Sequence, residues 1–196
     1  MQEAVPVGEG SMAAIIGLDD DLIVEQERIN REVLSMQQIE SFNAAILLNP
    51  KNIWAYVLHS VETPMNPNIK DMDKAIVIEP NNPTLHQMRG AIYEMVAALK
   101  MLDNQNADVT KYLNSSLESY NKAVELTPKD AKAYINRGDY YRDILSDYDK
   151  ALVDYNTAIK LAPQNGDAYK SRAELYKELK KYSEAVKDYQ SALKFD

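Results

Sequence analysis

The chain has 196 residues, and 45% of them are hydrophobic, which is enough for a sizeable core. Thirty acidic residues against 22 basic ones give a formal net charge of −8, so the phosphate backbone of a nucleic acid would be repelled on average. There is no cysteine, which excludes disulfides and thiolate metal sites. We therefore expect a folded domain with no nucleic acid among its partners.

The N-terminal segment lacks the features of a secretory signal and of a membrane anchor. Glu3 and Glu9 precede the first basic residue, Arg28, whereas a signal peptide begins with a basic stretch. The longest apolar run, residues 12–18, contains Gly17 and is far shorter than the roughly 20 residues that a membrane span needs. We predict a cytoplasmic protein without a membrane partner.

Residues 2–23 have a pattern of their own, QEAVPVGEGSMAAIIGLDDDLI. The phrase AVPVGEGSMAAIIGLDD resembles a segment of malonyl-CoA:acyl carrier protein transacylases, in which a strand is followed by a helix. The resemblance implies acyl transfer from a serine on a G-x-S-x-G turn. No G-x-S-x-G occurs here, because Gly10 and Ser11 are followed by Met12 and Ala13. A malonyltransferase fragment, expected to be inactive, is therefore the alternative interpretation.

Four prolines divide the rest of the chain. Pro50, Pro80, Pro128 and Pro163 each follow an apolar run of helical character, and they lie 30, 48 and 35 residues apart. Proline ends a helix because it has no amide proton and restricts the residue before it. The prolines therefore predict repeat boundaries, regular at the C-terminal end and irregular before it.

Two C-terminal stretches share the spacing Y-x2-R-G-x2-Y, with Ala in place of Gly in the second, followed by A-x3-Y-x2-A. Their landmark residues are Tyr134, Arg137, Gly138, Tyr141, Ala151, Tyr155, Ala158 and Pro163, and then Tyr169, Arg172, Ala173, Tyr176, Ala185, Tyr189 and Ala192. The spacing resembles the tetratricopeptide repeat, in which W-x2-L-G-x2-Y, A-x3-F and P recur about every 34 residues. Over residues 36–196 the resemblance implies an all-α, short right-handed solenoid of helix-turn-helix repeats, the first of them degenerate.

The pattern predicts five segments: 1–23 as a transacylase-like appendage, 24–82 as degenerate helical repeats, 83–130 as a lengthened unit, and 131–165 and 166–196 as regular units. In the regular units we expect helices over 131–142, 148–161, 167–179 and 183–194, with one extra residue in the turn 144–147. Upstream we expect helices over 54–61, 69–78, 88–102 and 109–126, the last two joined by a turn over 103–108. Residues 22–48 predict either one long helix or a pair with a break near Ser35.

Small residues and tyrosines alternate in the two regular units. Gly138, Ala151, Ala173 and Ala185 are predicted where helix backbones approach closely, and tyrosines such as Tyr155 and Tyr189 where gaps between helices must be filled. A tyrosine can bury its ring and still expose its hydroxyl to water.

Arg137 and Arg172 recur together with Asp154 and Asp188. One interpretation places the arginines in a groove that grips a peptide carboxylate, as some chaperone-binding members of the resembled family do. The other is an Arg–Asp pair that joins the two helices of each unit, and the recurrence in successive units favours it. Asn136 matches one position of the family's carboxylate clamp, but Met88 and Ser171 do not complete it.

No other pattern predicts chemistry. Gly8, Gly10 and Gly17 lack the spacing of a phosphate-binding loop, and the run 19–21 lacks that of a calcium loop. His59 and His86 have no paired ligand at metal spacing, so each is expected on a helix face with a local hydrogen bond. We expect no catalytic residue, no cofactor and no metal.

The function that these patterns favour is a non-catalytic scaffold that binds a protein or peptide. The resemblance implies a concave surface lined by the first helix of each repeat. Its predicted partner-binding residues are Gln87, Lys132, Asn136, Asp139, Arg142, Lys170, Ser171, Glu174 and Lys177. The last helix leaves apolar residues at an edge, Val186, Leu193 and Phe195, which predicts self-association there.

Overall fold

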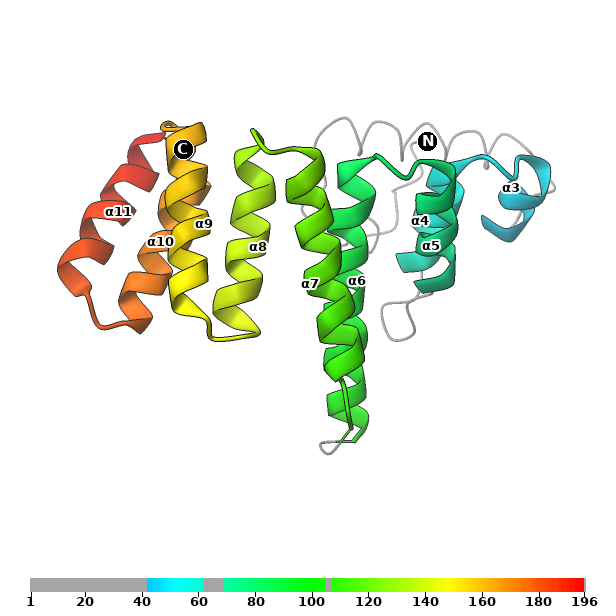
Figure 1. Ribbon diagram of the computed structural model, residues 1–196, viewed down its shortest axis with the longest axis horizontal. Coiled ribbons are helices and arrows are strands. Elements are labelled where there is room, and N and C mark those ends of the chain that lie inside the picture. Colours follow the sequence, from blue (N-terminus) through cyan, green and yellow to red (C-terminus); the bar gives the residue numbers. More distant parts are fainter. Residues whose placement is uncertain (1–41, 62–68, 105–106, 196) are drawn as a thin grey trace, which may run out of the picture. The chain divides into compact units, whose positions relative to one another are not determined.

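A computed structural model describes residues 42–61, 69–104 and 107–195 (Figure 1). Within these ranges every regular element is an α-helix, and the helices follow one another as antiparallel hairpins, so the fold is the expected all-α helical solenoid. The chain divides into two compact units, Met1–Leu113 and Asn114–Asp196. The transacylase-like segment 2–23 and the expected helix over 22–48, up to residue 41, lie outside the described residues.

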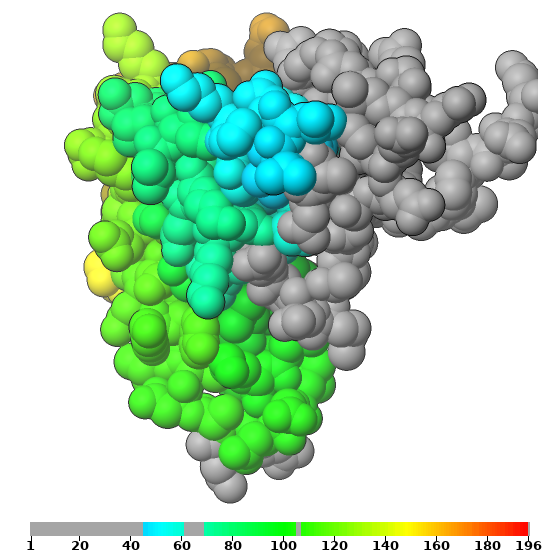
Figure 2. Space-filling view, turned by 90° about the vertical axis from the view of Figure 1, so that its right-hand side faces the viewer, coloured from blue at the N-terminus to red at the C-terminus, as the bar shows by residue number. Residues whose placement is uncertain are grey.

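The first unit contains helices α3 (Phe42–Leu48), α4 (Ile53–Val61), α5 (Ile69–Ile78) and α6 (Pro83–Asp103). Helix α4 contacts both α3 and α5, and α5 contacts α6, so the core forms where these helices meet. Val57, Met72 and Leu85 are at its centre, each 1% exposed or less. The cyan atoms of α3 and α4 lie against the blue-green atoms of α5 in the space-filling view (Figure 2).

Most of helix α7 (Thr110–Leu126) belongs to the second unit, together with α8 (Ala131–Asp143), α9 (Tyr148–Leu161), α10 (Gly166–Glu178) and α11 (Tyr182–Phe195). Helices α8 and α9 form one hairpin and α10 and α11 the next, while α10 also contacts α8 and α9 (Figure 1). Stacking of this kind buries the face that a single hairpin cannot cover alone.

The helices predicted from residue 54 onward are confirmed, and apart from the start of α6 their ends shift by at most one residue. The largest difference is at α6, which begins at Pro83 rather than residue 88, because Asn82 caps it by accepting from the backbone N–H of Thr84 at 3.1 Å. Each helix before a boundary proline ends two residues ahead of it, as at Leu161 before Pro163. The division into repeat units stays a prediction, and the boundary at 113/114 between the compact units falls inside the predicted unit 83–130.

The turns inside the two regular hairpins share a left-handed residue and a backbone bond to the end of the first helix. Ser146 and Lys180 have positive φ angles of 51° and 59°. Just after each of them, a backbone N–H reaches back to the end of the first helix: Asp147 to the carbonyl of Tyr141 and Lys181 to that of Tyr176, both at 2.8 Å. This is a helix C-terminal motif with a left-handed residue. The first turn spans 144–147 and the second 179–181, so the extra residue lies where it was predicted.

Gly138 is required by the close approach of α8 to α9. A Cβ atom at this position would lie 2.7 Å from Cε1 and 2.9 Å from Cδ1 of Tyr155, whose side chain is fully buried. Real Cβ atoms do not approach other atoms so closely, and a buried ring cannot move aside. The prediction of a small residue at a close approach is confirmed here.

Candidate functional site

Arg137 joins three helices of the second unit. From α8 its Nε and Nη2 donate to the two carboxylate oxygens of Asp154 on α9, both at 2.8 Å, and its Nη1 donates to Oδ1 of Asn121 on α7 at 3.0 Å. Asp154 is only 3% exposed. A bidentate hydrogen bond to a buried carboxylate fixes the angle between the helices as well as their distance. The same hydrogen bonding raises the pKa of Arg137.

Arg172 repeats the same arrangement one hairpin later. Its Nε and Nη2 donate to Asp188 on α11 at 2.7 and 2.8 Å, and its Nη1 donates to Asn156 on α9 at 2.6 Å. The pairing interpretation of the arginines is therefore confirmed. In both hairpins the guanidinium already holds a protein carboxylate, so neither arginine serves the peptide-gripping interpretation.

The first unit carries a reduced form of this link. His59 and Arg89 each lie nine residues after a boundary proline, as Arg137 and Arg172 do. His59 Nδ1 contacts the carboxylate of Asp71, which lies nine residues before Pro80, as Asp154 does before Pro163. Arg89 Nη1 bonds the preceding helix at Asp73, 3.4 Å away. The expectation that His59 makes a local hydrogen bond is confirmed, and the histidine takes the place of an arginine.

A second repeated contact ties each first helix to the proline before it. The side chain six residues after each boundary proline lies within hydrogen-bond distance of that proline's carbonyl oxygen, at 3.3, 2.8, 3.2 and 3.1 Å. Three of these side chains are tyrosines and one is histidine: Tyr56, His86, Tyr134 and Tyr169. Because the same bond recurs at irregular repeat lengths, it belongs to the start of the first helix and not to the spacing of the repeats.

A groove of about 380 Å³ lies between α8 and α10, the first helices of the two regular hairpins. Ten residues line it, and seven of them are predicted partner-binding residues: Lys132, Asn136, Asp139, Arg142, Lys170, Ser171 and Glu174. The others are Ile135, Asn165 and Asp167. The structure thus brings most of the predicted set to one concavity.

The two remaining predicted residues lie elsewhere. Gln87 is on α6, in the first unit, and Lys177 is exposed in the last turn of α10 outside the groove. The prediction also missed Asn165 and Asp167, which lie at the beginning of α10. The proline at 163 could have indicated them, because it places the start of the next first helix a few residues later.

Arg142 is not the outward-facing residue that the pattern predicted, since only 8% of it is exposed. Its Nη1 donates to the backbone carbonyl of Ser171 at 3.0 Å, and its Nε donates to Asp143 at 2.6 Å. Asp139, Glu174 and Glu178 lie 3.5, 3.3 and 3.7 Å from its guanidinium. Arg142 therefore crosses from α8 to α10 and forms part of the groove's floor.

Asp139 lies beside Arg142 and accepts a hydrogen bond from a residue of α9. The Tyr155 hydroxyl donates to its Oδ1 at 2.7 Å. Burial raises the pKa of the Asp139 carboxyl, although Tyr155, Arg142 and Ser171 each act to lower it. Burial likewise raises the pKa of Tyr155, so its hydroxyl stays a donor. The floor is therefore a layer of hydrogen-bonded side chains.

The chemistry available in the groove is recognition by charge and hydrogen bonding. Within the ranges that the structure describes, no group of three His, Asp or Glu side chains is placed to hold a metal ion. Over the same ranges, no helix is both long enough and apolar enough to span a bilayer. The groove offers amide, hydroxyl, ammonium and carboxylate groups at fixed positions on two helices.

Two segments of the second unit match a known family model. Residues 119–153 and 154–187 match the family model described as tetratricopeptide repeat. Among solved structures, the chain is similar to TTC0263, a thermophilic TPR protein in Thermus thermophilus, with 21% identity over 78% of each chain and a TM-score of 0.62. It is also similar to the MamA protein, with 19% identity over 95% of this chain and 92% of that one and a TM-score of 0.60.

At these identities the likeness to solved structures shows the fold alone. A comparison with curated protein sequences gives no match. The comparisons do not support the transacylase resemblance of residues 2–23.

Proposed function

Because residues 119–153 and 154–187 match the tetratricopeptide repeat family model, we propose that the chain is a non-catalytic scaffold that binds a protein or peptide in the groove between α8 and α10. Stacked repeats of this kind form concave surfaces suited to extended ligands. The observation that carries the proposal is the concentration of seven predicted residues around one polar concavity. A cytoplasmic location and the absence of nucleic-acid partners stay predictions from composition.

Two features of the groove suit a binding surface. Its floor is already assembled, because Arg142, Asp139 and Tyr155 are fixed by one another, so little ordering is needed when a ligand arrives. Its rim carries Lys132 and Lys170, which are exposed, and Asn136, which is partly exposed. Long side chains above a rigid floor can adapt to a ligand while the floor sets its position.

The test uses the purified full chain and a peptide selected against it from a random display library. The double variant Asn136→Ala and Lys170→Ala should weaken binding of that peptide by about tenfold or more, as expected when central polar contacts are truncated. The matched control, Asn114→Ala with Lys160→Ala, changes exposed residues of the same types on α7 and α9 and should leave the affinity unchanged. Helicity by circular dichroism should be the same in all three proteins. Equal affinity in the two variants would show that the groove is not the binding surface.

We also propose that a second copy of the chain covers the exposed face of α11. Val186 and Leu193 are 55% and 79% exposed. Their counterparts 34 residues earlier, Leu152 and Ile159, are packed into cores that include Leu175 and Ala168 of α10. The exposed pair therefore has the chemistry of a face that is covered one hairpin earlier. Phe195 adds less to this exposed face than predicted. It is only partly exposed, because its ring packs on that of Tyr169 with the centroids 5.7 Å apart.

Sedimentation equilibrium of the full chain tests this association. Leu193→Glu should shift the chain to monomer, because a charge in a packed apolar interface is costly. Val153→Glu, a change at another exposed apolar residue that is 64% exposed on α9, is the control and should leave the assembly intact. A strict monomer for the unchanged chain at high concentration would contradict the proposal.

A further inference from the structure

We propose, on the basis of the proposed function, that the occupant of the groove is an extended peptide with separated charges. One end carries a carboxylate that lies beside Lys132 and Lys170, and a Lys or Arg side chain four to five residues away lies beside the carboxylates around Arg142. The inference names the chemical class of the ligand, and it follows from an uneven distribution of charge along the groove.

The end of the groove where α8 and α10 begin is cationic. Lys132 is the second residue of α8 and Lys170 the fifth of α10, and both are exposed. Asp167 is the carboxylate among the lining residues at this end, so the local sum of the lining charges is positive. The N-terminal end of α10, which is capped by the neutral Asn165, adds partial positive charge, whereas the end of α8 is capped by the carboxylate of Asp130. A carboxylate is the group that this end would attract.

The opposite end is anionic. Among the lining residues at this end, Arg142 is the cation and Asp139 and Glu174 are the carboxylates. Asp143 and Glu178, which do not line the groove, also lie within 4 Å of the Arg142 guanidinium. One positive charge among four negative ones leaves an excess of negative charge, and the C-terminal ends of α8 and α10 add to it. Burial that raises the pKa of Asp139 shows the cost of holding negative charge there. An incoming ammonium or guanidinium group would lower that cost.

The spacing of the two ends sets the spacing of the peptide's charges. Lys132 and Arg142 are ten residues apart on one helix, which corresponds to about 15 Å at about 1.5 Å per residue. An extended peptide covers about 3.3 Å per residue, so four to five residues span that distance. Between the ends, Asn136 and Ser171 line the groove. An amide and a hydroxyl can both donate to and accept from a peptide backbone.

Overall charge leads to a different expectation. A chain with a net charge of −8 would favour a uniformly basic peptide if only its summed field mattered. The local arrangement predicts that such a peptide is disfavoured beside Lys132 and Lys170, and that a uniformly acidic peptide is disfavoured at the other end. Peptides of equal composition and different order separate the two explanations, since their net charge is the same.

The experiment measures fluorescence anisotropy of labelled peptides with the purified full chain at low salt. Three capped peptides share one composition: EESAAKK, its reverse KKAASEE, and the mixed-charge AEKEKAS, in which no Glu lies four or five residues from a Lys. One of the two block-charge peptides should bind at least about tenfold more tightly than the mixed one, and added salt should reduce the difference because exposed charges are screened. The better orientation also reports the direction of the peptide in the groove.

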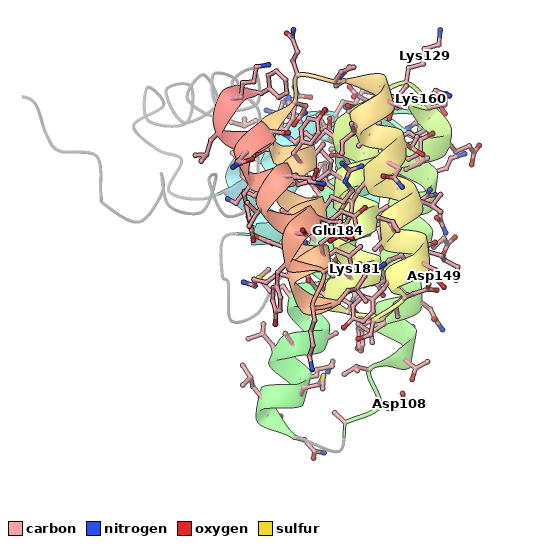
Figure 3. The ribbon with its side chains drawn as sticks, turned by 90° about the vertical axis from the view of Figure 1, so that its left-hand side faces the viewer. Asp108, Lys129, Asp149, Lys160, Lys181 and Glu184 are labelled. Atoms are coloured by element: carbon pink, nitrogen blue, oxygen red, sulfur yellow. The ribbon has the colours of Figure 1, made fainter. Side chains whose placement is uncertain are left out.

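Charge-reversal variants locate the effect. Lys132→Glu with Lys170→Glu should remove the preference for the block-charge peptide. The control reverses two lysines outside the groove, Lys160 at the end of α9 and Lys181 just before α11 (Figure 3), with the same change in net charge. It should keep the preference within about twofold. Circular dichroism confirms that both variants remain helical.

Each outcome is informative. Block-charge peptides that bind no better than the mixed one, or a control as damaging as the groove variant, would overturn the inference. If the display-selected peptide still loses affinity with Asn136→Ala and Lys170→Ala in that case, the proposed function stands without it. If that variant has no effect, the proposed function itself is overturned.

Discussion

The two regular hairpins share their polar links and differ in their packing. In α8–α9 and in α10–α11 the same Arg–Asp–Asn bonds recur, with Nε–Asp distances of 2.8 and 2.7 Å and Nη1–Asn distances of 3.0 and 2.6 Å. Tyr155 on α9 is fully buried, whereas its counterpart Tyr189 on α11 is partly exposed. The polar links need only a hairpin and the helix before it, whereas a buried tyrosine also needs the hairpin that follows.

The core around Tyr155 shows why. Its neighbours in that core are Tyr141 and Ala151 from its own hairpin and Leu175 from α10. One hairpin earlier, the ring of Tyr120 packs on that of Tyr140 of α8, with the ring centroids 5.6 Å apart. Tyr140 is the counterpart of Leu175, as Tyr120 is of Tyr155. A tyrosine on a second helix is thus covered by the first helix of the next hairpin.

Tyr155→Ala and Tyr189→Ala should differ strongly. Removal of the fully buried ring leaves a cavity and should lower the free energy of unfolding by about 3–5 kcal/mol, the usual range for a buried aromatic. Tyr189→Ala removes a partly exposed ring and should lower the free energy of unfolding by less than half as much. Urea denaturation followed by circular dichroism gives both values. Equal losses would show that the following hairpin does not complete the tyrosine's packing.

Arg137→Leu and Arg172→Leu should instead cost nearly the same. Each leaves a buried aspartate, 3% and 6% exposed, without its partner, and such a loss is roughly 3 kcal/mol. Replacing both partners, as in Arg172→Leu with Asp188→Leu, should recover much of the stability because no charge is left buried. The same denaturation series measures all three variants. A large difference between the two single variants would break the claim that the links are equivalent.

Gly138→Ala tests the close approach of α8 to α9. Alanine favours a helix over glycine by about 1 kcal/mol, but its Cβ would lie 2.7 Å from the buried Tyr155 ring, and overpacking costs about 1–3 kcal/mol. We therefore expect a net loss of about 1 kcal/mol. The double variant Gly138→Ala with Tyr155→Leu removes the ring and should show no further loss from the alanine. A stabilised Gly138→Ala protein would contradict the packing.

Asp139→Asn should have the smallest effect, and its sign depends on pH. The pKa of Asp139 is raised in the folded chain, so its contribution to stability is present below the unfolded-state pKa and is lost as pH rises through the folded-state value. Asparagine has no proton to lose. Relative to the unchanged chain, the variant should therefore be more stable at pH 7 than at pH 3, by under about 1 kcal/mol. Asp149→Asn, at an exposed residue of α9 labelled in Figure 3, is the control for the same change of side chain outside the groove.

The sequence predicted the helices well because the residues that begin and end them act locally. Prolines such as Pro128 and Pro163 end one helix, and an Asp or Asn shortly after caps the next, as Asp130 and Asn165 do. Gly138 and the Arg–Asp pairs were also predictable, since close packing and a buried link impose the same residue types at the same spacing. These features depend on neighbours within one hairpin.

The groove was predicted less completely because its charges are decided by tertiary contacts. Periodicity placed Arg142 on an outward face, but its long side chain folds back to Ser171 and Glu174 on the next hairpin. The third partners Asn121 and Asn156 were missed, although each lies 16 residues before its arginine. That constant separation was the available signal. The pairing of His59 with Asp71 was not predicted, because the unit that contains it is shorter than the regular ones.

The most direct test of the central claim is a two-dimensional amide NMR titration of the full chain with the tighter block-charge peptide. Binding in the groove predicts the largest shift changes at residues of α8 and α10, with Lys132, Asn136, Ser171 and Glu174 foremost. Changes confined to α9, α11 or the first unit would contradict the claim.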